Sequence, residues 1–229
     1  MQNDSSLMID AAIVGRRSTR AFLNEVVPAE LIGNILAVAS RAPSGCNMQP
    51  WHVHVLTGAA LQRMVSAVCH AYDHEPEQHT SEFQHSPTDY FEPYQSRRRK
   101  MGFAMYGLVG IPKGDKERMR LQQRRNFEFF GAPVGMFFTV HRDLPAASLV
   151  GYGAFLQNIM VSSEGHGLGS CFQTGWCDYH RVIASGLKFG AEEMLLGGMA
   201  IGYADNDAPI NQLRTERVDV SEFALFHQA

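Results

Sequence analysis

The chain has 229 residues, of which 45% are hydrophobic, and a formal net charge of −3. A chain of this length can bury a full core within one domain, and none of its segments reaches the roughly 18 to 20 consecutive apolar residues of a membrane span. The slightly negative charge argues against a general nucleic-acid-binding protein, because binding to phosphates along a backbone requires a broad positive surface.

The N-terminal residues and the cysteines indicate the compartment. Residues 1–6 are polar and lack the positive and apolar regions of a secretory signal. The four cysteines are scattered and include no C-x-x-C pair, so we expect reduced thiols and no disulfide framework. These features predict a cytoplasmic protein with no membrane partner and no nucleic-acid partner.

In the first third of the chain, apolar periodicity predicts three helices and one strand. A basic segment, Arg16-Arg17-Ser18-Thr19-Arg20, follows Gly15 and is expected to be extended. Pro28 and Glu30 give the second helix a clear start. The expected elements are helices over about residues 6–14, 28–40 and 59–72, and a strand over residues 51–56.

The character of the sequence changes at residue 73. From there to about residue 101 the chain is polar, aromatic and charged, and three prolines argue against any long regular element. Tyr90, Phe91 and Tyr94 precede the basic run Arg97–Lys100, a combination that suits a lid over a planar ligand, packing against a partner subunit, or a solvated surface. We expect one domain over residues 1–229 with an excursion at about 73–120.

The pattern of residues 121–204 predicts helices and strands with no regular β-α-β alternation, which favours the α+β class. The helix at 147–164 is apolar nearly all round, as expected for a core helix or a subunit interface. The expected elements are helices over residues 121–130, 147–164 and 179–187, and strands over residues 134–140, 170–174 and 194–204.

The basic segment is a candidate anion site. In an extended chain alternate side chains share a face, so Arg16, Ser18 and Arg20 would offer two guanidinium groups and a hydroxyl to one phosphate monoester. In a helix, Arg16 and Arg20 would still share a face at i,i+4 and would repel each other unless an anion lay between them. A solvated basic turn is the alternative to both.

A second motif, residues 42–51 (APSGCNMQPW), follows one helix length later. Pro43 and Gly45 end the preceding helix, whereas Ser44 and Asn47 are short polar residues that favour turns and can bond a ligand. In this order and spacing the two motifs resemble those of the FMN-dependent nitroreductases, in particular the nitrobenzoate-reductase-like branch. The resemblance extends to Gly167-Leu168-Gly169-Ser170-Cys171 and to Arg217, and so covers nearly the whole chain.

The resemblance implies a nitroreductase-like α+β fold, with a central, mostly antiparallel sheet flanked by helices, in an intertwined homodimer. It implies that FMN is the cofactor, with the phosphate or the flavin pyrimidine edge bound by the basic segment, and with the second motif contributed by the other subunit. The implied cofactor-binding residues are Arg16, Arg17, Ser18, Arg20, Pro43, Ser44, Gly45, Asn47, Gln49, Asn126, Gln173, Thr174, Gly175 and Arg217.

Two parts of this assignment depart from a simple match. In the family, a backbone N–H at the end of a strand faces flavin N5, and this segment often contains Pro and Glu. Phe172 and Thr174 replace them in this chain, so the resemblance implies a backbone contact with N5 but no carboxylate role. Arg124, Arg125 and Asn126 lie where the family places a basic residue and an amide near flavin O2 and N3. The register there is open, and a solvated helix face is equally compatible.

The implied activity is a ping-pong cycle in which hydride passes from NADPH or NADH to the flavin and then to a planar, electron-poor acceptor. Nitroaromatic compounds are the leading class of acceptor. No side chain is required as a catalytic group, because the cofactor supplies the redox chemistry. The alternatives are reduction of quinones or enones, reductive dehalogenation, and, more remotely, a nucleic-acid-binding or regulatory protein.

Histidines are the remaining candidate ligands. His52 and His54 are expected on one face of a strand, and a second group comprises His70, His74, His79 and His85. Neither group has cysteines or carboxylates at ligand spacing, so no metal site is expected.

Overall fold

The computed structural model describes residues 4–227. Its sheet has four strands in the order β1-β2-β4-β3, and every neighbouring pair is antiparallel. The central strands are buried along nearly their whole length, as expected for strands covered on both faces. The strands are β1 (His52–Thr57), β2 (Val134–His141), β3 (Gly169–Gln173) and β4 (Glu193–Gly202).

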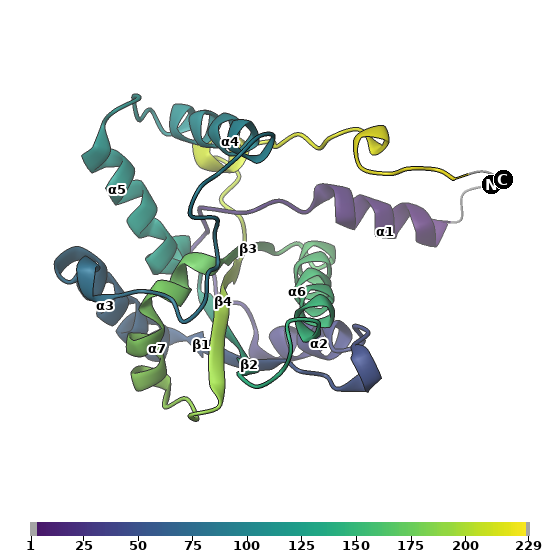
Figure 1. Cartoon of the computed structure of the whole chain (residues 1–229), viewed down its shortest axis with the longest axis horizontal. Helices are drawn as coiled ribbons and strands as arrows, with labels where there is room; N and C mark the ends of the chain where they lie inside the picture. The colour runs from purple at the N-terminus through teal and green to yellow at the C-terminus, as the bar shows by residue number, and fades with distance from the viewer. Residues whose placement is uncertain (1–3, 228–229) are drawn as a thin grey trace.

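Helices cover both faces of the sheet and enclose two hydrophobic clusters (Figure 1). On one face lie α2 (Ala29–Ala39) and α6 (Ser148–Gly165), which pack against each other. On the other face lie α3 (Gly58–His74), α7 (His180–Leu187) and two 3-10 helices, η3 (Arg125–Gly131) and η4 (Thr174–Tyr179). The second cluster centres on Trp176, which is fully buried and stacks on Phe129 at 4.3 Å.

An arm extends from this body. It consists of α1 (Asp4–Gly15) and the C-terminal segment, which run to the same side of the molecule in Figure 1. The arm is apolar and exposed: Met8 of α1 is 74% accessible and Val14 is 83% accessible. Large apolar side chains gathered on one exposed surface are typical of an interaction site.

The excursion contains more regular structure than the sequence predicted. The expectation of no long element is wrong, because α4 (Tyr94–Leu108) starts directly after Pro93, a residue that is compatible with a helix start. The predicted helix at 121–130 is also misplaced. Asp115 caps Arg118 N at 3.1 Å and starts α5 (Lys116–Arg124). Residues 125–131 form the 3-10 helix η3 instead, in which buried Phe129 and Phe130 have left-handed φ values of 47° and 55°.

The other predicted elements are confirmed, with boundaries that differ by at most a few residues. Within the described residues, none of the helices combines the length and hydropathy needed to cross a bilayer.

Candidate cofactor site

The basic segment lies along the edge strand β3. Ser18 forms a parallel bridge with Ser170, and Thr19 N donates to Ser170 O at 2.9 Å. Thr19 is buried, so the side chains on either side of it in the sequence point away from the core. The extended interpretation of this segment is therefore confirmed, and the helical alternative is wrong.

The thiol of Cys171 on β3 lies within electrostatic range of Arg16 and Arg20 and beside Ser18. Burial raises the pKa of this thiol, while the charges of Arg20 and Arg16 and a hydrogen bond with the Ser18 side chain act in the opposite direction. Among the described residues, neither arginine is paired with a carboxylate, and the Arg20 guanidinium donates to the carbonyl of Ser18, at 3.3 Å. Two guanidinium groups and a hydroxyl thus face one side with their charge uncompensated, a composition that suits a phosphate.

Arg17 points elsewhere, because its Nη2 donates to Asn206 Oδ1 at 2.8 Å. A cofactor contact from Arg17 stays a prediction.

Asn211 holds the end of the basic segment in place, and no local sequence pattern predicts this role. Its Oδ1 accepts from Arg20 N at 2.7 Å, and its Nδ2 donates to Ala21 O and to Asp205 O, both at 2.8 Å. The side chain is buried and joins positions about 190 residues apart in the chain. Only the folded structure brings these positions together.

An amide pair lies at the other end of β3. Gln173 Nε2 donates to Asn126 O at 2.7 Å and to Asn126 Oδ1 at 3.3 Å. The Oε1 atom of Gln173 is buried and has no hydrogen-bond partner among the described residues, which is unusual for a native amide. Thr174, exposed, and Gly175, half-buried, follow at the start of η4.

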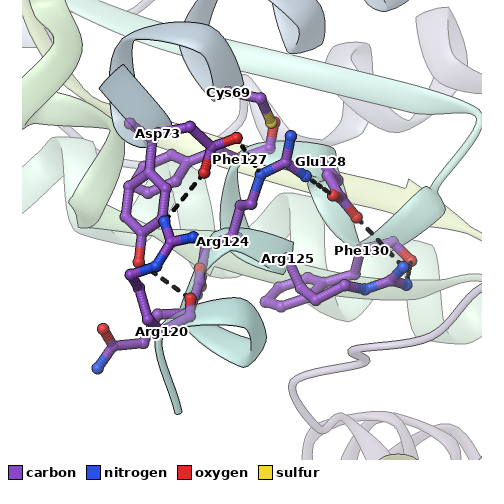
Figure 2. Close-up of polar contacts among 11 residues, drawn as sticks. Cys69, Asp73, Arg120, Arg124, Arg125, Phe127, Glu128 and Phe130 are labelled. Carbon is purple, nitrogen blue, oxygen red and sulfur yellow. Dashed lines mark hydrogen bonds and ion pairs between the residues drawn. The ribbon is translucent and has the colours of Figure 1, made fainter. Parts of the chain in front are cut away.

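Arg124 and Arg125 are both paired with carboxylates (Figure 2), although the Arg125 side chain is also 44% accessible to solvent. Arg124 Nε donates to Asp73 Oδ2 at 2.8 Å and its Nη1 donates to Glu128. Arg125 pairs with Glu128 at 3.2 Å and also donates to the Phe130 carbonyl at 3.2 Å. This network ties α5 and η3 to α3, so of the three candidates at 124–126 only Asn126 contacts another predicted flavin residue.

The loop at residues 43–49 is exposed and strained. Cys46, Asn47 and Gln49 have φ values of 50°, 55° and 50°, a region that non-glycine residues rarely adopt. Gln49 N donates to Ser44 Oγ at 2.9 Å, which helps to hold this conformation. Strain concentrated at an exposed polar loop is typical of ligand-binding segments.

The loop and the basic segment lie at opposite ends of α6. The Pro43 carbonyl packs so closely on Gly151 that a Cβ there would lie 2.8 Å from it, whereas a Cβ at Gly15 would lie 3.0 Å from Glu164 Oε1. Gly151 and Glu164 are separated by about 20 Å along the helix axis. Figure 1 shows α1 and the loop that follows α2 on different sides of α6. One chain therefore does not bring Asn47 and Gln49 to Arg16 and Arg20.

Arg217 lies in a groove of about 530 Å³ between α4 and the C-terminal segment. Its Nη1 donates to Thr215 Oγ1 at 2.9 Å and to Glu216 O at 2.8 Å. Arg97 and Lys100 line the same groove and pair with Glu222 and Glu216, at 3.7 and 2.6 Å. Arg217 thus lies with the basic run of α4, and its contact with a phosphate stays a prediction.

Taken together, the antiparallel sheet between helical layers and the cationic face along β3 define an α+β protein with a candidate site for a phosphorylated planar cofactor. The chain belongs to the nitroreductase family, whose sequence model matches residues 13–203.

Two curated relatives align over nearly their whole length. The nitrobenzene nitroreductase of Ectopseudomonas oleovorans is 39% identical over 222 residues, 97% of this chain and 98% of the relative. The 4-nitrobenzoate reductase of Pseudomonas putida is 36% identical over 217 residues, 95% of this chain and 94% of the relative. The predicted family is therefore confirmed.

Among solved structures, the chain is similar to the FMN-dependent nitroreductase NfnB from Mycobacterium smegmatis, in complex with NADPH. The TM-score is 0.93 at 30% identity, and the match covers 98% of this chain and 100% of that chain. The nitroreductase fold predicted for this chain is confirmed.

Proposed function

We propose that this chain is an FMN-dependent oxidoreductase that uses NADPH or NADH to reduce nitroaromatic compounds in a ping-pong cycle. The observation that carries the proposal is the uncompensated cationic face of Arg16, Ser18 and Arg20 beside β3, with an amide pair at the far end of the same strand. The names of relatives and structural neighbours, which include nitrobenzene and 4-nitrobenzoate reductases and FMN-dependent proteins, support the same conclusion.

The donor set fits FMN. Ser170, opposite Ser18, and Gln173 are about 10 Å apart along the strand, so charged donors and neutral amides are separated along one edge. The FMN phosphate would bind at the charged end, beside Arg16, Ser18 and Arg20. The polar edge of the flavin ring, which has both N–H and C=O groups, would bind at the amide end. The free Gln173 Oε1 is an acceptor suited to a ring N–H.

FMN, when bound, supplies the hydride chemistry, and the protein's residues bind and orient it. Arg16, Ser18 and Arg20 hold the phosphate, and Asn126 and Gln173 hold the ring edge. The backbone N–H groups of Thr174 and Gly175 are proposed to face flavin N5. Arg217 is included in the proposed site as a further phosphate ligand, and Arg17, although its guanidinium donates to Asn206, as a further cofactor contact.

We include a homodimer in the proposal. The loop at 43–49 lies about 20 Å along α6 from its own basic segment, so in a two-fold dimer it would complete the site of the other protomer. The exposed apolar surface of α1 and of the C-terminal segment supplies a surface for that association. Within this proposal, the chain acts as a single domain in the cytoplasm.

The proposed acceptor is an acidic nitroaromatic such as a nitrobenzoate. Arg97 and Lys100 are paired with glutamates, but Arg98 stacks over the Tyr90 ring at 4.6 Å, and neither Arg98 nor Arg99 is paired with a carboxylate among the described residues. This part of α4 can therefore attract a carboxylate on the substrate. The relatives named for nitrobenzene and for 4-nitrobenzoate support nitroaromatics of either charge, so the preference for an acid rests on the basic residues of α4.

The test is steady-state turnover of the purified flavoprotein with NADPH against nitrobenzoates, neutral nitrobenzenes, quinones, enones and halogenated phenols. The proposal expects the highest kcat/KM for nitrobenzoates. A higher kcat/KM for quinones, enones or halogenated phenols would assign that class as the acceptor instead. A colourless protein that co-purifies with nucleic acid would contradict the whole proposal.

A further inference from the structure

Two histidines and a glutamate meet at the β1 side of the sheet. Their ligand atoms, His52 Nδ1, His54 Nε2 and Glu193 Oε2, all lie within 4.8 Å of one another. The two ring nitrogens are 2.8 and 2.9 Å from Glu193 Oε2. His52 and His54 share one face of β1, and Glu193 reaches them from the first residue of β4, across the intervening strand β2. The carboxylate whose absence led us to expect no metal here is thus supplied from a distant part of the chain.

Neighbouring groups hold the carboxylate in place. Glu193 Oε1 accepts from Gly190 N at 2.9 Å, and Oε2 accepts from Thr139 Oγ1 at 2.7 Å. Thr139 is fully buried on β2, so its hydroxyl is a fixed donor. Outer hydrogen bonds of this kind orient the ligands of protein metal sites.

The two rings are also positioned, and one side of the cluster is open to solvent. His54 stacks on Phe189 with centroids 4.6 Å apart, and the His52 and His54 rings are in edge contact at 4.7 Å. The His52 side chain is 62% accessible, whereas that of Glu193 is 14% accessible. The cluster is therefore preorganised by strands and has an entry path for an ion.

Glu193 Oε2 is approached by more polar groups than it can accept hydrogen bonds from. The Thr139 hydroxyl and the nearer nitrogen of each histidine ring all approach this one oxygen. A carboxylate oxygen has about two lone-pair sites, so three donors exceed its capacity. A divalent cation bound to both ring nitrogens and to the oxygen would replace two donor protons with one ion.

We propose that His52, His54 and Glu193 bind one divalent transition-metal ion, with water completing the coordination. Two imidazole nitrogens and one carboxylate oxygen form a donor set that suits Zn²⁺ in tetrahedral geometry. The nearby Arg142 leaves the carboxylate free, because its Nη2 donates to Glu82 and to the Glu193 backbone carbonyl. The bound ion would clamp edge strand β1 to β4.

The test uses the full-length flavin-loaded protein after treatment with a chelator. Calorimetric titration with ZnCl₂ is expected to show one ion bound per chain. Zn²⁺ is also expected to raise the Tm, because it binds the native state.

Single variants locate the site. His52→Ala, at an exposed position, and Glu193→Gln are each expected to weaken Zn²⁺ binding at least tenfold. Thr139→Val is expected to weaken it about 10- to 100-fold by releasing the carboxylate. The matched control is His85→Ala, which removes a ring bonded to Asp178 Oδ1 at 3.0 Å that does not belong to the His52, His54 and Glu193 cluster, and it is expected to bind Zn²⁺ as the wild type does.

Wild-type protein that takes up no Zn²⁺ would overturn the proposal. So would His52→Ala and Glu193→Gln variants with wild-type affinity, or an equal loss in His85→Ala. Circular dichroism confirms that each variant is folded. The readout is binding rather than turnover, so the result is independent of the proposed reductase activity.

Discussion

Gln173 donates from Nε2 to both oxygen atoms of Asn126, and this contact joins residues 47 positions apart across the end of β3 and η3. The amide of Gln173 is thereby fixed in one orientation, since its nitrogen must face Asn126. Its Oε1 is left as a buried acceptor without a partner in the described part of the chain. A buried acceptor costs about 1–3 kcal/mol when unsatisfied, so this position is suited to a ligand donor.

Replacing Gln173 by Leu tests this assignment. The variant keeps the volume but removes the acceptor, so FMN binding is expected to weaken by roughly 1–3 kcal/mol, or about 5- to 150-fold. Flavin fluorescence titration measures the change. Gln62→Leu, at an exposed position on α3, is the control and is expected to bind FMN normally. Equal affinity in Gln173→Leu and wild type would remove Gln173 from the flavin site.

The cationic face of the basic segment gives the second prediction. Arg16→Ala and Arg20→Ala each remove a charge-assisted hydrogen bond worth about 1.5–3 kcal/mol, so each is expected to weaken FMN retention roughly tenfold or more. The measurement is flavin content after dialysis. Arg41→Ala, on an exposed residue after α2, serves as the control. Full flavin content in both variants would exclude a phosphate at this face.

The third prediction concerns the loop at residues 43–49. If the loop completes the partner's site, a chain with Arg16→Ala and Arg20→Ala and a chain with Asn47→Ala and Gln49→Ala are each expected to be inactive alone. Unfolding and refolding them together is expected to restore about a quarter of the wild-type sites, because each mixed dimer has one intact site.

Turnover per chain and light scattering measure this result. A refolded mixture that shows dimers but no recovered turnover would place the loop in the site of its own chain. A monomer that retains FMN would contradict the dimer altogether.

The ion-pair network around Asp73 gives a pH-dependent prediction. Burial alone would raise the pKa of Asp73, but hydrogen bonds from Arg124 and Arg120 outweigh it and lower the pKa below 3.8. A carboxyl with a lowered pKa in the folded state contributes stability at pH values above its unfolded pKa. That contribution is lost as the pH falls through the folded pKa.

Asp73→Asn is therefore expected to lower the free energy of unfolding by about 1–3 kcal/mol at neutral pH, with the difference from wild type shrinking below about pH 4. Denaturant unfolding at a series of pH values measures it. Asp207→Asn, an exposed residue, is the control. A difference that stays constant down to strongly acidic pH would show that the charge of Asp73 is not responsible.

The sequence predicted what depends on local pattern. The alternation of Arg16, Ser18 and Arg20 depends only on an extended backbone, and the bridge of Ser18 to Ser170 confirms it. No local sequence pattern predicts the contacts between distant segments of the chain. Glu193 lies 139 residues from His54, and Asn211 lies 191 residues from Arg20, so their contacts depend on the sheet order and the path of the C-terminal segment.

The excursion was mispredicted for a different reason. Pro93 argues against regular structure only within an element, whereas proline before the first helical turn does not disrupt a helix, and α4 begins at the next residue. The left-handed φ values of Phe129 and Phe130 were unpredictable from propensity, because burial of the rings against the Trp176 cluster determines them.

In the proposed function, a bound flavin passes reducing equivalents from a nicotinamide cofactor to a nitroaromatic acceptor. The most direct test is an anaerobic half-reaction experiment on the purified, FMN-loaded protein, followed by flavin absorbance. Addition of NADPH is expected to bleach the flavin, and subsequent addition of 4-nitrobenzoate is expected to restore its colour, because the two substrates react in separate steps. Flavin that is not reduced by NADPH or NADH, or reduced flavin that 4-nitrobenzoate fails to reoxidise, would contradict the account.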